Sequence, residues 1–192
     1  MSQAPESHPM ILTRESTVLV VLDVQERLFH AMDADHREEV MRNIKVLTTS
    51  ARRLRLPILV TEQYPKGLGH TLQELVDTLG PGVEPIEKVT FSCCGLDEFR
   101  ARLEAAGARH VVLTGIEAHV CVLLSALDLL GRGYRVHVVA DAVTSRTQAN
   151  WRLAMDQLRQ AGAVVTTTET VLFQLLRQAG TDEFRELAQL IR

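Results

Sequence analysis

The sequence is short of lysine and cysteine, and it lacks long runs of basic residues. Only three of its 21 basic residues are lysines, Lys45, Lys66 and Lys88, and the formal net charge is −3. Without a basic stripe that could follow a phosphate backbone, nucleic acid is not an expected partner. Three cysteines, two of them adjacent (Cys93 and Cys94), do not make the framework of a disulfide-rich domain.

Targeting and membrane-spanning signals are also missing. The first residues, MSQAPESHPMIL, lack the basic start and the apolar stretch of a signal peptide. No apolar run reaches the roughly 18 residues that a membrane span needs. We therefore expect a cytoplasmic protein in a reducing compartment, with no membrane partner.

The chain has a suitable length for one domain. It has 192 residues, of which 46% are hydrophobic and 23% are charged, as in ordinary soluble proteins. A chain of this mass can bury about 70% of its unfolded surface without disulfides or metals. We expect a single domain over 1–192, in which 1–13 form a loose N-terminal segment.

Short apolar runs alternate with amphipathic stretches along the chain. This alternation predicts a three-layer α/β/α sandwich with a mostly parallel, Rossmann-like sheet of five or six strands. The β-branched residues in the runs favour strands over helices. The expected strands are 17–23, 57–63, 110–116, 135–143 and 163–169, with a weaker sixth at 84–90.

Helices are expected between these strands. Asp35 with Glu38 and Thr71 with Glu74 have the spacing of capping boxes. The leucine-rich stretches 119–130 and 171–190 carry more apolar surface than one small sheet needs, so we expect a homo-oligomer. The expected helices are 37–54, the segment from 71 to Gly80, 96–106, 119–130, 146–161 and 181–191.

The residues that follow the apolar runs are the candidates for chemistry, because open parallel sheets bind ligands outside the carboxyl ends of their strands. Asp23 ends the first run, Lys88 follows the short one, and Cys121 falls in the first turn of the helix 119–130. The start of a helix favours a thiolate. The three suit a general base, an electrostatic activator and a nucleophile. From spacing alone, a structural role for Cys121 in the core is equally compatible.

Four segments carry a family resemblance: VVLDVQERLF, TEQYPKGLGHT, EKVTFSC and LTGIEAHVCVLLSALDLLGRGYRVHVVADAVTSR. They resemble the isochorismatase-like cysteine hydrolases, which include nicotinamidases and N-carbamoylsarcosine amidohydrolases. The likeness runs from about residue 14 to 175 and is strongest to small isochorismatase-domain hydrolases with GIEAHVCV. It implies a catalytic triad of Asp23, Lys88 and Cys121. It also implies a cis peptide between Ile116 and Glu117, near an oxyanion hole that includes the Cys121 N–H.

The expected activity is therefore hydrolysis of a small amide or a related C–N bond, through a thioester on Cys121. True isochorismatases lack this cysteine, so its presence favours acyl chemistry. Two alternatives stay open: a nicotinamidase, and a non-catalytic small-molecule-binding or scaffold protein on the same fold. A nucleotide-binding protein is not expected, because no G-x-G-x-x-G or P-loop follows the first strand.

Five residues near the strand ends are candidates for substrate binding, although each also suits plain packing: Gln25, Phe29, Tyr64, Phe91 and His119. His119 lies two residues from Cys121 and could form a dyad with it, but we favour a place in the pocket wall.

Other polar and apolar residues favour structural roles. Glu117 could anchor its loop, and Asp141 suits a helix N-terminus better than a second base. Trp151 and Met155 indicate core or subunit contact. The adjacent cysteines Cys93 and Cys94 are expected to be inert.

A metal site is not expected. Nicotinamidases carry an Asp-x-His and a further His after the second strand, whereas this chain has Thr61-Glu62-Gln63-Tyr64-Pro65 there. Glu62 and His70 could act as ligands, but a surface role for His70 is favoured. We expect no metal and no other cofactor, and this departure also disfavours nicotinamide as the substrate.

Overall fold

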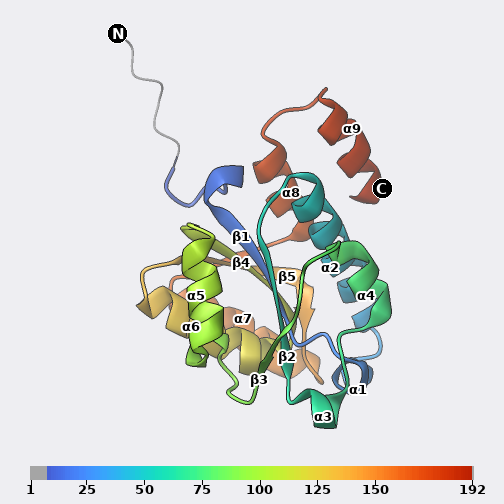
Figure 1. Cartoon of the computed structure of the whole chain (residues 1–192), viewed down its shortest axis with the longest axis vertical. Helices are drawn as coiled ribbons and strands as arrows, with labels where there is room; N and C mark the ends of the chain where they lie inside the picture. Colours follow the sequence, from blue (N-terminus) through green and yellow to red (C-terminus); the bar gives the residue numbers. More distant parts are fainter. Residues whose placement is uncertain (1–7, 192) are drawn as a thin grey trace.

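The computed structural model describes residues 8–191 as one sheet between two layers of helices (Figure 1). The six strands are all parallel and lie in the order β3-β2-β1-β4-β5-β6. This arrangement confirms the predicted α/β/α sandwich with a Rossmann-like sheet. The strands are β1 (Thr17–Leu22), β2 (Ile58–Gln63), β3 (Ile86–Lys88), β4 (His110–Ile116), β5 (Arg135–Thr144) and β6 (Val164–Thr166).

The helices divide between the two faces of the sheet. Helices α2, α4, α8 and α9 cover one face and α5, α6 and α7 cover the other (Figure 1). The helices are α1 (Glu26–His30), α2 (Arg37–Arg53), α3 (Pro65–Leu68), α4 (Gln73–Leu79), α5 (Asp97–Ala105), α6 (Leu123–Gly131), α7 (Gln148–Gln160), α8 (Thr168–Leu176) and α9 (Asp182–Leu187). A π-helical turn, Ala118–Val122, precedes α6. The predicted helices include none of α1, α3 and α8.

Strand β1 is buried along its whole length, which explains its uninterrupted apolar run. Val18, Val20 and Leu22 pack on the side of α5–α7, and Leu19 and Val21 pack on the side of α2 and α8. Each buried Val or Leu side chain stabilises the fold by roughly 1.5–3 kcal/mol. The central strand therefore provides a rigid frame for whatever follows it.

Both predicted capping boxes are wrong. Helix α4 begins after Leu72 without a side-chain cap, because Thr71 donates its N–H and its hydroxyl to Glu62 Oε1 at 2.7 and 2.8 Å. Helix α2 begins after His36, also without a side-chain cap, so Asp35 does not have the predicted role. At Thr71, a partner on β2 has replaced the local helix cap.

The predicted strand 163–169 is too long at its C-terminal end. Strand β6 ends at Thr166, and α8 begins at Thr168. The Thr168 N–H and hydroxyl donate to Asp141 Oδ1 at 2.8 and 2.9 Å, and the Thr167 hydroxyl accepts from the N–H of Thr170. Asp141 thus organises a helix N-terminus, as predicted.

The expected loose segment 1–13 is packed at its C-terminal end. Leu12 is fully buried, and its N–H donates to Gln174 Oε1 at 3.0 Å. Residues 1–7 lie outside the described part of the chain. Met155 is buried in the core and Trp151 packs against it while its indole N–H donates to Ala140, so the pair contributes to packing within the subunit.

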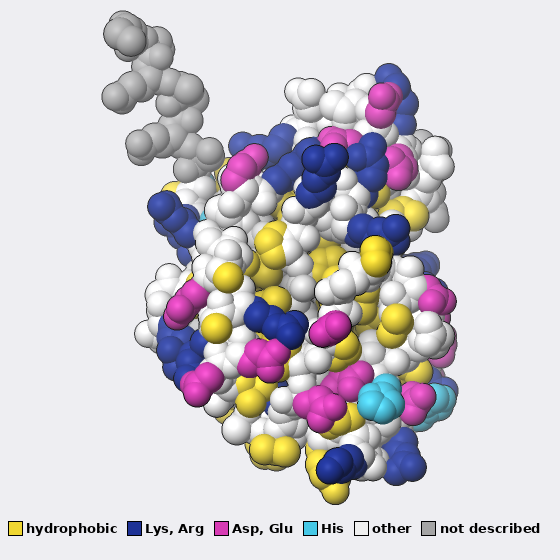
Figure 2. Space-filling view, in the orientation of Figure 1, with side chains coloured by type: hydrophobic (Ala, Val, Ile, Leu, Met, Phe, Trp, Pro, Cys, Tyr) yellow, Lys and Arg dark blue, Asp and Glu magenta, His cyan; other side chains and the backbone are white. Residues whose placement is uncertain are grey.

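The surface mixes charges of both signs. On the face drawn in Figure 2, acidic and basic side chains lie among each other with apolar side chains between them. That distribution agrees with a net charge of −3 and with the lack of a basic stripe in the sequence. Within residues 8–191, no helix combines the length and the apolar character needed to cross a membrane.

Candidate active site

Asp23 and Lys88 form a fully buried ion pair at the carboxyl ends of the strands. Asp23 follows β1 and Lys88 ends β3, with β2 between them. Lys88 Nζ lies 2.7 Å from Asp23 Oδ2, and neither side chain is exposed. The hydroxyl of Thr61 on β2 donates to Asp23 Oδ1 at 2.7 Å. Both carboxylate oxygens therefore have a donor, as a buried charge requires.

Asp23 also turns the chain after β1. Its φ is +56°, a left-handed conformation that Asp and Asn tolerate better than most residues. Its N–H donates to the carbonyl of Thr61 at 3.1 Å, and its own carbonyl accepts from Gln25. The backbone thus directs the carboxylate toward β3 in a tight, hydrogen-bonded turn.

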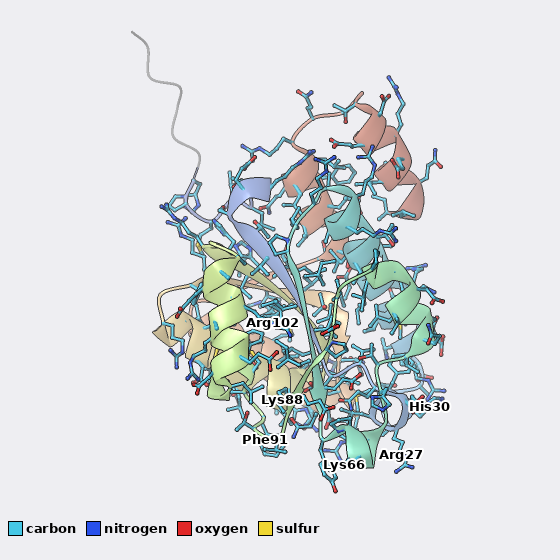
Figure 3. The ribbon with its side chains drawn as sticks, viewed as in Figure 1. Arg27, His30, Lys66, Lys88, Phe91 and Arg102 are labelled. Atoms are coloured by element: carbon cyan, nitrogen blue, oxygen red, sulfur yellow. The ribbon has the colours of Figure 1, made fainter. Side chains whose placement is uncertain are left out.

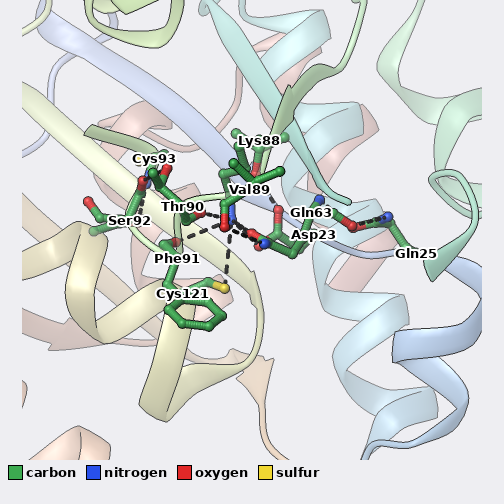
Figure 4. Close-up of polar contacts among 12 residues, drawn as sticks. Asp23, Gln25, Gln63, Lys88, Val89, Thr90, Phe91, Ser92, Cys93 and Cys121 are labelled. Atoms are coloured by element: carbon green, nitrogen blue, oxygen red, sulfur yellow. Dashed lines mark hydrogen bonds and ion pairs between the residues drawn. The ribbon is translucent and has the colours of Figure 1, made fainter. Parts of the chain in front are cut away.

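Cys121 completes the cluster from the other side. It lies in the π-helical turn after β4, the strand next to β1, and only 4% of it is exposed. Its Sγ is 3.7 Å from Lys88 Nζ (Figure 4). The structure therefore brings together the three residues that the sequence predicts as a triad. π-Helical turns occur frequently at functional sites.

Lys88 is held by more than its carboxylate. Its ammonium donates to Gln63 Oε1 at 2.6 Å and to the carbonyls of Thr90 and Phe91 at 3.2 Å (Figure 4). These contacts hold the segment after β3 against the site. In Figure 3, Lys88 and Phe91 lie at the same end of the molecule as Lys66 and Arg27.

The pKa of the Cys121 thiol is raised, not lowered. Burial and, next to it, the Asp23 carboxylate raise this pKa to about 12, although the Lys88 ammonium opposes both. The predicted preference for a thiolate at the helix start is therefore wrong for this state, because loss of solvent and the nearby carboxylate outweigh the helix and the ammonium. The thiol holds its proton at neutral pH, next to a carboxylate that can accept it.

The loop before Cys121 contains the expected cis peptide, between Ile116 and Glu117. Gly115 precedes it with a φ of +111°, and a Cβ at this position would collide with the carbonyl oxygen of Leu22 on β1. Only glycine fits such a close approach of two strands at this φ. The carbonyl of Glu117 then accepts from the N–H groups of Val120 and Val122 at 3.1 and 3.2 Å.

Two side chains anchor this loop to the loop after β5. Glu117 Oε2 lies 3.0 Å from Arg146 Nε, in agreement with the predicted anchoring role. His119 Nδ1 lies 2.9 Å from the hydroxyl of Ser145. Because this nitrogen of His119 contacts Ser145, the geometry favours a place for His119 in the pocket wall over a dyad with Cys121.

The other proposed substrate-binding residues differ in their exposure: two lie at the surface and two are buried. Tyr64 and Phe91 are 54% and 56% exposed, so their rings are available at the surface. Phe29 is buried in the core. The side-chain amide of Gln25 donates to the carbonyls of Gln63 and Gly69 and accepts from the N–H of Gln63. Gln25 thus connects the turn after β1 to the end of β2 and to the segment after α3. Substrate contacts by these residues and by His119 stay predictions.

Glu62 and His70, the pair considered as metal ligands, contact each other. Glu62 Oε2 lies 3.0 Å from His70 Nδ1, and Glu62 Oε1 accepts twice from Thr71. The carboxylate raises the pKa of His70. No group of three or more His, Cys, Asp or Glu side chains in the described part of the chain could hold a metal ion.

Two polar residues of the site were not predicted from the sequence. Thr61 binds Asp23, and Gln63 binds Lys88. Both lie at the end of β2, beside the two charged residues. The same rule that selects Asp23 and Lys88, that polar residues at strand ends gather at one edge, would have found them.

Comparison with known proteins places this chain in a family. The family described as Isochorismatase domain matches residues 17–170. The chain is 39% identical over 184 residues to the secreted isochorismatase effector Isc1 of Phytophthora sojae, covering 94% of this chain and 87% of the relative. It is 40% identical over 182 residues to isochorismatase domain-containing protein 1 of Danio rerio, but covers only 62% of that longer protein.

Solved structures agree with this placement. The structure described as MAR1 ribonuclease from Caenorhabditis elegans has a TM-score of 0.88 at 38% identity, over 94% of this chain and 91% of that one. The nicotinamidase SaPncA of Staphylococcus aureus shares the fold, with a TM-score of 0.69 at 19% identity over 80% and 99% of the two chains. The match over residues 17–170 and the relatives of similar length together show that the chain belongs to the isochorismatase family.

Proposed function

We propose that this protein is a metal-independent cysteine hydrolase that cleaves a small amide or a related C–N bond. The observation that supports this proposal is the buried cluster of Asp23, Lys88 and Cys121, in which Lys88 Nζ contacts both the carboxylate and the thiol. A carboxylate, an ammonium and a thiol in mutual reach provide a base, a fixed positive charge and a nucleophile. A core that needed only packing would not maintain two buried charges.

In the proposed first half-reaction, the Cys121 Sγ attacks the carbonyl carbon of the substrate while its proton passes to Asp23. The C–S bond forms, and the carbonyl oxygen takes up the negative charge. When the carbonyl re-forms, the C–N bond breaks, and Asp23 returns the proton to the leaving nitrogen. Ammonia or an amine departs, and the acyl group stays on Cys121 as a thioester.

In the second half-reaction, Asp23 takes a proton from a water molecule as that water attacks the thioester. The C–S bond then breaks, the thiolate recovers a proton from Asp23, and the acid is released. The raised pKa of Cys121 supports transfer of the thiol proton during attack rather than before it, since a resting thiolate is disfavoured. Lys88 would stabilise the negative charge on sulfur as it develops.

The oxyanion would be bound by backbone N–H groups of the loop after Ile116 and Glu117, together with the N–H of Cys121. This loop is held at its start, by the close approach of Gly115 to β1 and by the contact of Glu117 with Arg146. Preorganised donors of this kind contribute about 2.7–4 kcal/mol each to stabilising a transition state.

The same proposal includes a homo-oligomer. Apolar side chains stand exposed in both leucine-rich regions of the sequence, with Leu124 and Leu127 on α6 and Phe173 on α8 each 40% exposed. Sedimentation at several concentrations tests this, and a monomer throughout would overturn it. A cytoplasmic location stays a prediction, since one relative is named a secreted effector.

A screen read by ammonia release tests the activity. It would cover small amides, including nicotinamide, with ureas and carbamoyl compounds. Single-stranded RNA is a separate arm, because one similar structure is described as a ribonuclease, and it is followed by gel electrophoresis since phosphodiester cleavage releases no ammonia. We expect one class of C–N substrate to be hydrolysed by the wild type and not by Cys121→Ala. Full turnover by Cys121→Ala would exclude the thioester mechanism. A folded wild type without activity on any C–N compound would favour the binding or scaffold alternative.

A further inference from the structure

Gln63 is bonded through each of its polar groups, and two of these bonds reach the site. Its side-chain Oε1 accepts from Lys88 Nζ at 2.6 Å, and its Nε2 donates to the carbonyl of Val89 at 2.9 Å. Its backbone N–H and carbonyl both pair with the amide of Gln25, at 2.7 and 3.0 Å. The backbone of Gln63 is therefore fixed by Gln25, and its side chain cannot turn away from Lys88 without also losing its contact with Val89.

The Lys88 ammonium faces more acceptors than it has protons. It carries three N–H groups. Two of its contacts are short, to Gln63 Oε1 at 2.6 Å and to Asp23 Oδ2 at 2.7 Å. Three further acceptors compete for the remaining N–H group: the carbonyls of Thr90 and Phe91 at 3.2 Å and the Cys121 Sγ at 3.7 Å. With Asp23 and Gln63 each holding one N–H, a single N–H serves the other three acceptors.

Gln63 also holds the segment that supplies the competing carbonyls. Val89 is 73% exposed and Phe91 is 56% exposed, so side-chain packing fixes this segment only weakly. The bond from Gln63 Nε2 to the Val89 carbonyl ties its backbone to the end of β2. One side chain thereby controls both the direction of the ammonium and the position of the acceptors that compete with Cys121.

We propose that Gln63 is a positioning residue that limits how much of the Lys88 positive charge reaches the Cys121 sulfur. By holding one N–H as a neutral acceptor, it leaves the ammonium paired mainly with Asp23 until the thiol proton moves. The catalytic consequence rests on the proposed hydrolase function, but the electrostatic role of Gln63 does not.

Two substitutions at Gln63 separate this role from a purely structural one. Gln63→Leu removes the neutral acceptor and releases an N–H toward Cys121, so the thiolate becomes more favourable. Gln63→Glu has the same shape and adds a negative charge near the sulfur, so the thiolate becomes less favourable. A residue that merely braces the loops would, when replaced, loosen the site in both variants and change the thiol in one direction.

The measurement is the rate at which iodoacetamide modifies Cys121 at pH 8, followed by mass spectrometry of the Cys121 peptide. We expect Gln63→Leu to be faster and Gln63→Glu slower than the wild type, each by roughly tenfold, the change in thiolate population that one pKa unit brings. Gln157→Leu and Gln157→Glu, at an exposed position on α7, are the matched controls and should leave the rate unchanged.

Opposite signs at Gln63 support the proposal. Equal signs, reversed signs or no change in folded variants would overturn it. If Gln63→Leu does not fold, Gln63→Glu decides alone, and a rate equal to or above that of the wild type contradicts the role. Because alkylation needs no substrate, a failure of the hydrolase proposal, seen as full turnover by Cys121→Ala, remains distinguishable from a failure of this one.

Discussion

The two ends of the sheet bury polar side chains in opposite ways. At the carboxyl end, Asp23 and Lys88 are buried as charges, and each has several hydrogen-bond partners. At the amino end, His110 and His137 are buried on β4 and β5, with His110 Nδ1 and His137 Nε2 3.1 Å apart. Within residues 8–191, His137 Nδ1 has no partner, and burial lowers the pKa of His137 to about 4.

The comparison separates a site from a structural contact. The carboxyl end maintains charge in the interior at a cost in desolvation that only mutual pairing offsets. The amino end avoids this cost by keeping both imidazoles neutral, since burial also lowers the pKa of His110. Burial of polar groups alone therefore does not single out a site, whereas a partnered ion pair at the strand ends makes the carboxyl end the candidate site.

The largest expected effect comes from removing one charge at the carboxyl end. Lys88→Met leaves the Asp23 carboxylate buried without its cation, and breaking a buried pair costs about 3–5 kcal/mol. Urea unfolding at pH 7 should show this loss. The double variant Asp23→Asn with Lys88→Met should recover much of it. Equal stability of Lys88→Met and wild type at pH 7 would mean that the pair is not charged.

The next effect concerns the amino end and appears on acidification. The folded pKa of His137 lies below its ordinary value of 6.5, so the unfolded chain binds the proton more readily. The stability from its neutral form is complete above about pH 6.5 and is lost as the pH falls toward 4, by roughly 3 kcal/mol in total. Urea midpoints between pH 7 and 4 measure the loss.

His137→Leu provides the control for this titration. It removes the group that binds the proton, so its stability should vary less with pH over the same range, even if its stability at pH 7 is lower. An identical pH slope in His137→Leu and wild type would assign the acid sensitivity to other groups. Either result leaves the carboxyl end unaffected, which keeps the two regions separable.

The smallest effect is expected where a charged pair is half exposed. Arg146 contacts Glu117, but 59% of its side chain is exposed, so the pair contributes about 0.2–1 kcal/mol to stability. Arg146→Met should therefore unfold almost as the wild type does, while its turnover falls because the loop before Cys121 loses an anchor. A thermal unfolding scan beside an ammonia assay checks both parts. Loss of stability without loss of turnover would refute the anchoring role.

The sequence predicts the fold from strong local signals, and it predicts the three central residues from their places after strands together with the family resemblance. Uninterrupted apolar runs define the parallel strands, and Asp23 and Lys88 stand where two of these runs end. Thr71 and Asp35 show where such reasoning fails. Their spacing to a later Glu is that of a capping box, but Thr71 bonds to Glu62 on another element, and no local pattern encodes that competition.

The chemistry of Cys121 could not be predicted for a related reason. Its position at the start of a helix favours a thiolate, but the pKa depends on burial and on the distance to Asp23 and Lys88, which only the folded chain sets. The place of Gln63 at the end of β2 could have been predicted by the same rule as Asp23 and Lys88, but the direction of its amide toward Lys88 could not. The spacing of residues along the sequence therefore does not predict a pKa that depends on contacts made in the folded chain.

The central claim is that Asp23 keeps the proton on Cys121 until it accepts that proton itself. The rate of Cys121 alkylation at pH 8 in Asp23→Asn tests it most directly, since Asn keeps the shape and tolerates the left-handed backbone. Asp156→Asn, exposed on α7, is the control. The account predicts faster alkylation than in the wild type, because the carboxylate that raises the thiol pKa is gone, together with loss of hydrolysis. Unchanged or slower alkylation of folded Asp23→Asn would contradict it.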